Sequence, residues 1–363
     1  MKGRFPEHLC GDGPVNPFPG LKALERRIGH DIPHRLGSNE GLDMPHSVLR
    51  AALGEAFVEQ IRSYGDAEAY ALRQRLSEQL QLPLEALLVD AGADSLIALA
   101  LRGLVAVGET VVCAAGTYPT FAYFAQGHGC VLEEVPYHQT PEVLAPDLDA
   151  LAERAIQCQA RLVYLANPDN PSGYLHSDAA IAALRDRLPE DCWLLLDEAY
   201  HDFRDDETDS AVWPGVLRLR TFSKAHGLAG LRVGYAIGDP DMLAVLLKVR
   251  IHYAVSSIGQ QAVCLLLDQP DEVMLHIQQV KSRRARLRQL LLARGYRVMP
   301  SDTNFVAVCL TDAAQAMALQ QSLLAAGILV ARPAHPALAH LLRITAVEDA
   351  LTCLADLNPW QEG

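Results

Sequence analysis

Residues 221–235 read TFSKAHGLAGLRVGY, and this stretch decides which fold the chain is expected to adopt. An apolar, strand-like run ends at Ser223 and Lys224, a stretch of small residues follows, and Arg232 precedes a second apolar run. A lysine seldom lies at the end of a buried strand unless its amine has a partner. Two interpretations are open: an ordinary strand–loop–strand connection with a solvent-exposed Lys224, or the attachment point of a covalently held cofactor.

The composition is that of an acidic globular protein. The 363 residues carry a formal net charge of -13 and half of them are hydrophobic. This charge argues against sequence-independent nucleic-acid binding, and the densest basic segment, KSRRARLR at 281–288, is expected to form a solvated helix face. The eight cysteines are scattered, no apolar run reaches about 18 residues, and the first residues lack the apolar core of a secretory signal. We therefore expect a cytoplasmic protein with reduced thiols and no metal, membrane or nucleic-acid partner.

Three segments of the chain differ in pattern. Residues 1–44 begin with a Pro- and Gly-rich stretch, which predicts an irregular arm that packs on the small domain. In 45–244, helical patterns alternate with short buried runs such as RLVYLA and CWLLLD, which predicts a mostly parallel sheet covered by helices on both faces. In 245–363, a long helical stretch near 256–294 precedes short apolar runs and a helix near 312–326, which predicts a smaller α+β domain.

Polar side chains follow several of the predicted strands at the point where each strand ends. RLVYLA leads into NPDNPSG (167–173), CWLLLD leads into DEAY (197–200), and VLRLRTF leads into Ser223 and Lys224. Ligands of open α/β sheets collect at the carboxyl ends of the strands. A further segment, GADS at 92–95, starts a helix whose free N–H groups suit a phosphate. Each motif alone has an ordinary structural explanation, but their order along the sheet favours one shared site.

Pyridoxal phosphate requires such a set, because it needs a lysine amine, an acid beside its pyridine nitrogen, donors to its phenolic oxygen and a phosphate-binding cup. The chain resembles the fold-type-I pyridoxal-phosphate aminotransferases and is most similar to the histidinol-phosphate aminotransferase group. The resemblance runs from LGSNE (36–40) through TYPTF, NPDNPSG, DEAY and TFSKAHGLAGLRVGY to LRIT (342–345). It implies a large domain with a mostly parallel seven-stranded sheet flanked by helices, plus a smaller α+β domain.

The resemblance also implies roles for residues around the cofactor ring. Lys224 would form the Schiff base and then move the proton between the substrate Cα and the cofactor. Asp197 would face the pyridine nitrogen and keep it protonated. Asn170 and Tyr200 would donate hydrogen bonds to the phenolic oxygen, and Tyr118 would stack on the ring. The catalytic residues expected from the resemblance are thus Lys224, Asp197 and Tyr200.

Further residues are assigned by the same resemblance to the phosphate and the substrate. The phosphate would be held by Ala93, Asp94, Thr221, Ser223 and Arg232. Tyr64 of SYGD would reach it from the neighbouring subunit, so a homodimer with shared active sites is implied. Arg343 of LRIT would bind an anionic substrate group bidentately, with Asn39 nearby and Arg332 as a second candidate.

The substrate remains open at this point. Phe18, Ser95, His252 and Ala254 occupy positions where the histidinol-phosphate aminotransferases usually carry other residues, and such exchanges change discrimination strongly. The chain could transfer an amino group from histidinol phosphate to a 2-oxo acid such as 2-oxoglutarate, or act on an aromatic or other biosynthetic amino acid. It could also be a decarboxylase of the threonine-phosphate decarboxylase type. A non-catalytic protein that kept the fold is disfavoured, because Lys224 is intact.

Overall fold

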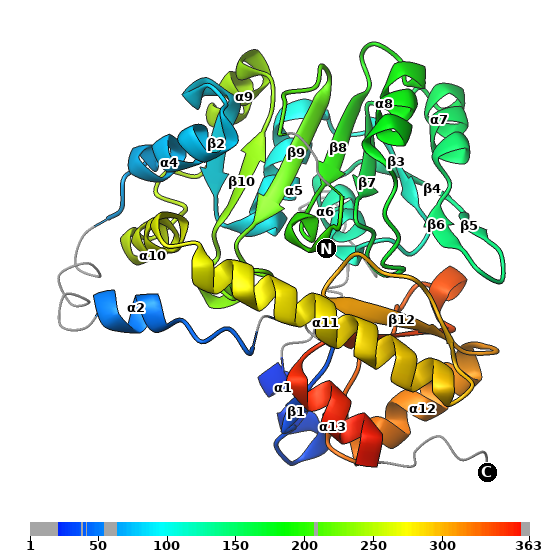
Figure 1. Ribbon diagram of the computed structural model, residues 1–363. Helices are drawn as coiled ribbons and strands as arrows, with labels where there is room; N and C mark the ends of the chain where they lie inside the picture. Colours follow the sequence, from blue (N-terminus) through cyan, green and yellow to red (C-terminus); the bar gives the residue numbers. More distant parts are fainter. Residues whose placement is uncertain (1–20, 38, 41, 54–63, 207–209, 357–363) are drawn as a thin grey trace, which may run out of the picture.

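The computed structural model describes residues 21–37, 39–40, 42–53, 64–206 and 210–356. Figure 1 shows a larger lobe built around one sheet and a smaller lobe beside one end of it, with the long helix α11 (Asp271–Ala293) running along both. The substrate-specificity candidate Phe18 lies outside the described residues. No helix of the described ranges is both long and apolar enough to cross a bilayer.

The larger lobe contains a seven-stranded sheet in the order β2-β10-β9-β8-β7-β3-β4. β10 is antiparallel to both of its neighbours, while the other neighbouring pairs are parallel. β7 is buried along its whole length, which explains why it reads as a continuous apolar run rather than an alternating pattern. β9 is buried throughout as well, although its sequence VLRLRT carries Arg218 and Arg220. The predicted mostly parallel seven-stranded sheet is confirmed. Its strands are β2 (Leu87–Asp90), β3 (Thr110–Ala114), β4 (Val131–Val135), β7 (Leu162–Ala166), β8 (Trp193–Asp197), β9 (Val216–Thr221) and β10 (Gly234–Ile237).

Helices cover both faces of this sheet. On one face the core cluster includes α5 (Gly92–Leu104), α6 (Pro119–His128) and α9 (Pro240–Leu247). On the other face α7 (Leu148–Gln157) and α8 (Asp178–Arg187) pack on β3, β7 and β8. On that same face α4 (Tyr70–Leu80) and α10 (Ser257–Asp268) pack on β2 and β10. The buried helix residues recur at helical spacing, so each helix presents one apolar stripe to the sheet.

The smaller lobe has its own antiparallel sheet, in the order β11-β12-β14. The N-terminal strand β1 pairs in parallel with β13, and Leu36 belongs to the core cluster of this lobe. Its elements are β1 (His34–Arg35), β11 (Arg297–Val298), β12 (Phe305–Cys309), β13 (Ile328–Leu329), β14 (Leu341–Thr345), α12 (Ala313–Ala325) and α13 (Glu348–Asp356). The remaining elements are α1 (Leu21–Ile28), α2 (Ser47–Ala52), β5 (Tyr137–Gln139), β6 (Leu144–Pro146) and the 3-10 helices Leu84–Ala86, His201–Phe203, Ala229–Leu231 and Pro336–Leu338.

Three expectations about helices need correction. The helical stretch predicted near 256–294 is two helices, α10 and α11, because Pro270 cannot donate a backbone hydrogen bond and ends the first helix. The segment 281–288 is not a uniformly solvated face: Arg284 is only 8 % exposed and donates to the Thr303 carbonyl at 2.8 Å. Residues 21–28 of the arm, expected to be irregular, form α1.

The predicted domain boundaries at 44 and 244 remain predictions. β1 contacts the smaller lobe through β13, in line with an arm that packs there. α10, however, packs against α4 and α2 in the larger lobe. These contacts favour a later boundary, within α11, for the start of the smaller domain.

Candidate active site

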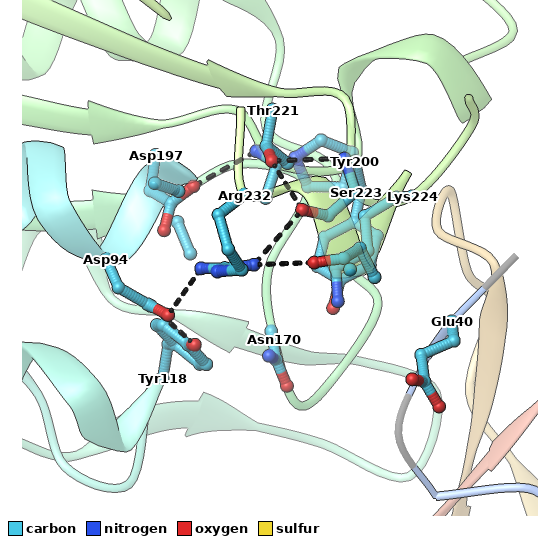
Figure 2. Close-up of a pocket in the computed structure, with 16 residues that line it drawn as sticks. Glu40, Asp94, Tyr118, Asn170, Asp197, Tyr200, Thr221, Ser223, Lys224 and Arg232 are labelled. Carbon is cyan, nitrogen blue, oxygen red and sulfur yellow. Dashed lines mark hydrogen bonds and ion pairs between the residues drawn. The ribbon is translucent and has the colours of Figure 1, made fainter. Parts of the chain in front are cut away.

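A cavity of about 330 Å³ lies at the carboxyl ends of β7, β8 and β9. Every cofactor residue expected from the sequence lines it except Tyr64. Figure 2 shows these side chains converging on one space, with Lys224 and Tyr200 on one side of it and Asp94 and Tyr118 on the other. The convergence follows from the topology, because parallel strands present their carboxyl ends at the same edge.

Asp197 is the last residue of β8 and is only 4 % exposed. Its Oδ2 accepts a hydrogen bond of 2.7 Å from the Tyr164 hydroxyl, and its Oδ1 accepts one of 3.0 Å from the Ala199 backbone N–H. Burial raises the pKa of Asp197 to about 6, and these hydrogen bonds oppose that rise. A buried carboxylate of this kind is stabilised by a cation, and the protonated nitrogen of a pyridine ring is one.

Lys224 follows β9 and points into the cavity, where its Nζ lies 5.7 Å from the centre of the Tyr200 ring. Tyr200 is buried and packs edge-on against Phe305 at a centroid distance of 5.3 Å. Its hydroxyl accepts a hydrogen bond of 2.8 Å from Asn39 Nδ2. The amine and the phenol thus face the same space from adjacent parts of the large lobe.

The opposite end of the cavity is rich in hydrogen-bond donors. Arg232 Nη2 lies 3.2 Å from Asp94 Oδ2, and Arg232 Nη1 lies 3.5 Å from Ser223 Oγ. The Tyr118 hydroxyl donates to Asp94 Oδ1 at 2.8 Å, and burial raises the pKa of this phenol. A Cβ added at Gly92, whose φ is +83°, would lie 2.8 Å from Arg232 Nη2, so a side chain there would displace the guanidinium.

These residues fit pyridoxal phosphate. Arg232, the hydroxyls of Thr221 and Ser223, and the N–H groups at the start of α5 form a donor set suited to a phosphate. Lys224 would hold the aldehyde carbon and Asp197 the pyridine nitrogen, while Asn170 and Tyr200 also line the cavity.

Arg343, on β14, is 9 % exposed and lies beside the cavity without lining it. Its Nη1 donates to Asn170 Oδ1, and its Nη2 donates to the Gly37 carbonyl at 2.9 Å. Its Nε has no hydrogen-bond partner, and no carboxylate pairs with Arg343 within the ranges that the structure describes. Burial lowers the pKa of this guanidinium. A buried cation with free donor capacity favours an anionic ligand.

The comparisons with known proteins identify the family. The family model for aminotransferase class I and II matches residues 32–352. The chain belongs to that family. Histidinol-phosphate aminotransferase 2 of Ralstonia nicotianae is 34% identical to this aminotransferase over 365 residues, covering 97% of this chain and 96% of the relative. The aromatic amino acid aminotransferase of Mycobacteroides abscessus is 35% identical over 285 residues, covering 77% of this chain and 80% of the relative.

A solved structure gives the same result. Histidinol-phosphate aminotransferase from Sinorhizobium meliloti, in complex with pyridoxal-5'-phosphate, matches this aminotransferase with a TM-score of 0.91 and 34% identity, covering 99% of this chain and 97% of that one. The fold class and the aminotransferase activity expected from the sequence are therefore confirmed, and pyridoxal phosphate is supported as the cofactor.

Other predicted site residues of this aminotransferase lie elsewhere. Tyr64 is 85% exposed and stacks on Tyr253 at 4.9 Å, away from the cavity of its own chain. Arg332 is directed outside the cavity, because it donates to Gln320 Oε1 at 3.2 Å. The structure therefore does not bring Arg332 to the substrate end, unlike Asn39, which is buried against Tyr200.

The suspected specificity positions are also removed from the cavity. Ser95 donates to the buried carboxylate of Asp90 at 2.9 Å, and neither His252 nor Ala254 lines the cavity of this chain. Sequence reasoning missed two polar residues at the site, Tyr164 and Glu40. Tyr164 lies within an apolar strand motif, and Glu40 directly follows Asn39 in LGSNE, so adjacency to recognised motifs was the available signal.

Proposed function

We propose that this pyridoxal-phosphate-dependent aminotransferase transfers the amino group of L-histidinol phosphate to a 2-oxo acid such as 2-oxoglutarate, by a ping-pong mechanism. The observation that carries the choice of an anionic donor is the buried guanidinium of Arg343, which has no carboxylate partner within the described ranges. A phosphate or a carboxylate placed at Arg343 would bring the neighbouring amine toward Lys224. The relatives that act on histidinol phosphate by name support the proposal.

An aromatic amino acid is the second candidate donor. A relative named as an aromatic amino acid aminotransferase is as similar in identity, at 35%. Both donors combine one anionic group, which suits Arg343, with one aromatic ring. The two candidates therefore use the same site chemistry and are separated by experiment.

The residues divide the work in this proposal. When bound, pyridoxal phosphate supplies an aldehyde for amine exchange and a ring that withdraws electrons from the donor Cα. Lys224 Nζ would remove the proton from that Cα and return it at the cofactor side, while Asp197 would hold the proton on the ring nitrogen. Asn170 and Tyr200 would bind the phenolic oxygen, and Tyr118 would cover one face of the ring. The phosphate would be held by Arg232, Thr221, Ser223, Ala93 and Asp94.

We also propose that the working unit is a homodimer in the cytoplasm. Tyr64 and Tyr253 form an exposed aromatic pair, and a second subunit would bury it and place Tyr64 near the partner's phosphate. All described cysteines are free thiols, which supports a reducing compartment.

A donor screen tests the proposal. Purified protein is mixed with single amino donors, including histidinol phosphate, histidine and the aromatic amino acids, and conversion of the bound cofactor to its amine form is followed by absorbance. We expect the highest second-order rate constant with histidinol phosphate. If every aromatic amino acid gave a higher rate constant than histidinol phosphate, an aromatic amino acid would replace histidinol phosphate as the proposed donor. Release of carbon dioxide without conversion of the cofactor would reject transamination.

A matched pair of variants tests the role of Lys224. Lys224→Ala should abolish the covalent cofactor absorbance and the conversion. Lys248→Ala, which removes an exposed lysine after α9, should leave both unchanged. Full conversion by Lys224→Ala would refute the assignment.

A further inference from the structure

Glu40 is a cavity-lining acid that the cofactor chemistry does not use. The acidic residues that line the cavity are Glu40, Asp94 and Asp197. The proposed function assigns Asp94 to the phosphate end and Asp197 to the ring nitrogen. Figure 2 shows Glu40 apart from both, on the side away from Asp94. We propose that Glu40 is a specificity-determining residue, selecting donors whose side chain ends in an N–H or O–H group over donors whose side chain ends in an anion. This inference rests on the proposed aminotransferase function.

The backbone around Asn39 fixes Glu40 at this place. Asn39 adopts a left-handed φ of 53° and is only 1% exposed. Its backbone N–H donates to Thr345 Oγ1 at 3.2 Å, and its carbonyl accepts from Asn304 Nδ2 at 3.2 Å. Its side chain reaches Tyr200 and Thr345, at 2.8 Å and 2.9 Å. A residue held by four hydrogen bonds in an uncommon conformation gives Glu40, the next residue, a defined position.

An ion pair with Arg35 restrains the Glu40 side chain. Arg35 Nη2 donates to Glu40 Oε2, and the two side chains are 32% and 27% exposed. Glu40 thus places a negative charge at the cavity, and the half-buried Arg35 guanidinium offsets part of that charge. The remaining field slows donors and acceptors with a second anionic group, including dicarboxylates, but does not exclude them.

The cations that line the cavity are assigned to groups other than Glu40. They are Lys224 and Arg232, and the proposed function assigns both to the cofactor. Arg343 lies beside the cavity and is assigned to the anionic group that all donors share. A side chain that ends in an anion therefore meets Glu40 without a cation of its own among the described lining residues. An imidazole or indole N–H, or a phenol, finds a hydrogen-bond acceptor there.

Three donors that differ only at position 4 of the ring test the proposal in the holoenzyme. They are phenylalanine, 4-aminophenylalanine and 4-carboxyphenylalanine. The readout is the second-order rate constant of cofactor conversion with each donor. We expect the wild type to convert 4-carboxyphenylalanine about ten-fold more slowly than phenylalanine. Glu40→Gln should remove most of this difference with little change for phenylalanine. Arg35→Gln should increase the difference, because the Glu40 charge is then no longer offset.

Glu153→Gln, which removes an exposed acid on α7, is the matched control and should behave as the wild type. An equal loss for all three donors in Glu40→Gln would show that Glu40 only holds the backbone and would overturn the proposal. A shift of the discrimination in the same direction by Glu40→Gln and Arg35→Gln would overturn it as well.

Binding of unreactive carboxylates separates this inference from the proposed function. The dissociation constants of 3-phenylpropanoate and 3-(4-carboxyphenyl)propanoate are measured by calorimetry with wild type and Glu40→Gln. We expect the second compound to gain several-fold in affinity in the variant, and the first to stay unchanged. If no donor is converted, the proposed function fails, while this affinity ratio still decides whether Glu40 discriminates by charge. An unchanged ratio overturns the inference.

Discussion

The Tyr164 hydroxyl lies 2.7 Å from Asp197 Oδ2 and donates to it from the neighbouring strand β7. Tyr164 is itself 1% exposed and stacks on Phe121, with ring centroids 4.4 Å apart. This packing fixes the phenol, so the carboxylate has one settled orientation below the cavity. Without a cationic ring nitrogen, however, Asp197 is a buried acid whose pKa rises to about 6 through burial.

Asp197→Asn should therefore stabilise the cofactor-free protein at neutral pH. The folded-state pKa of Asp197 lies above its unfolded value, so the stability contribution of this group is full below about pH 4 and is lost as pH rises through about 6. Asparagine does not titrate, so the variant should gain about 2–3 kcal/mol in free energy of unfolding over the wild type between pH 4 and pH 8. Urea unfolding across this range measures the difference. Parallel pH curves would contradict the assignment, and Asp186→Asn, at an exposed site on α8, is the control.

Glu198 should be the most costly acid to neutralise in this part of the sheet. Its Oε1 lies 2.9 Å from Arg218 Nη2, its Oε2 lies 2.9 Å from Arg220 Nε, and the three side chains are almost fully buried. The two guanidinium groups hold the pKa of Glu198 down at about 2, against the opposing effect of burial. Glu198→Gln leaves two buried cations without their anion, which costs about 3–5 kcal/mol in free energy of unfolding. Urea unfolding at pH 7 should show this loss and a change within about 0.5 kcal/mol for Glu153→Gln.

Arg343 and Arg332 should respond differently to the same substitution. Arg343→Gln removes the buried guanidinium beside the cavity, so we expect kcat/KM for amino donors to fall by about 100-fold or more. Arg332→Gln removes a side chain that bonds Gln320 and the Ala339 carbonyl outside the cavity, so kcat/KM should change by less than about three-fold. Steady-state kinetics with one donor compares them. Equal losses would mean that Arg332 reaches the substrate in the working enzyme.

Mixed dimers should recover activity if Tyr64 serves the partner's site. Neither Lys224→Ala nor Tyr64→Ala should be active alone at the wild-type rate, but a heterodimer of the two carries one site with both native residues. Chains with different affinity tags allow the heterodimer to be isolated and assayed. We expect up to about half of the wild-type activity per dimer. Recovery no greater than the sum of the two parents would place Tyr64 outside the shared site.

The sequence predicted the cofactor end of the site well because topology alone brings those residues together. Asn170, Asp197 and Lys224 each lie at or just after the carboxyl end of a buried parallel strand, and such strands must end at a common edge. The apolar runs of β7 and β8 were readable because these strands are buried on both faces. These features depend on order along the chain and on periodicity, which a single sequence displays directly.

The substrate end could not be predicted in the same way, because it depends on side-chain directions set by distant segments. Arg332 and Arg343 are only eleven positions apart and both were substrate-binding candidates from the sequence, Arg343 the first and Arg332 the second, yet one turns to Gln320 and the other to Asn170. Ser95 follows a motif of the phosphate cup but faces Asp90. Arg284 belongs to a basic run but is buried against Thr303. Each of these outcomes rests on a long-range contact that periodicity does not encode.

The contacts of Arg343 with Gly37, and of Thr345 with Asn39, join β14, which carries the buried guanidinium, to the segment that carries Glu40. Lys224, by contrast, belongs to the larger lobe. A rotation of the smaller lobe relative to the larger one would therefore move Arg343 and Glu40 together as one rigid unit. The distance between these two residues would stay constant while both approached Lys224 or moved away from it. The enzyme would then select donors by their length before the lobes close, and independently of that closure.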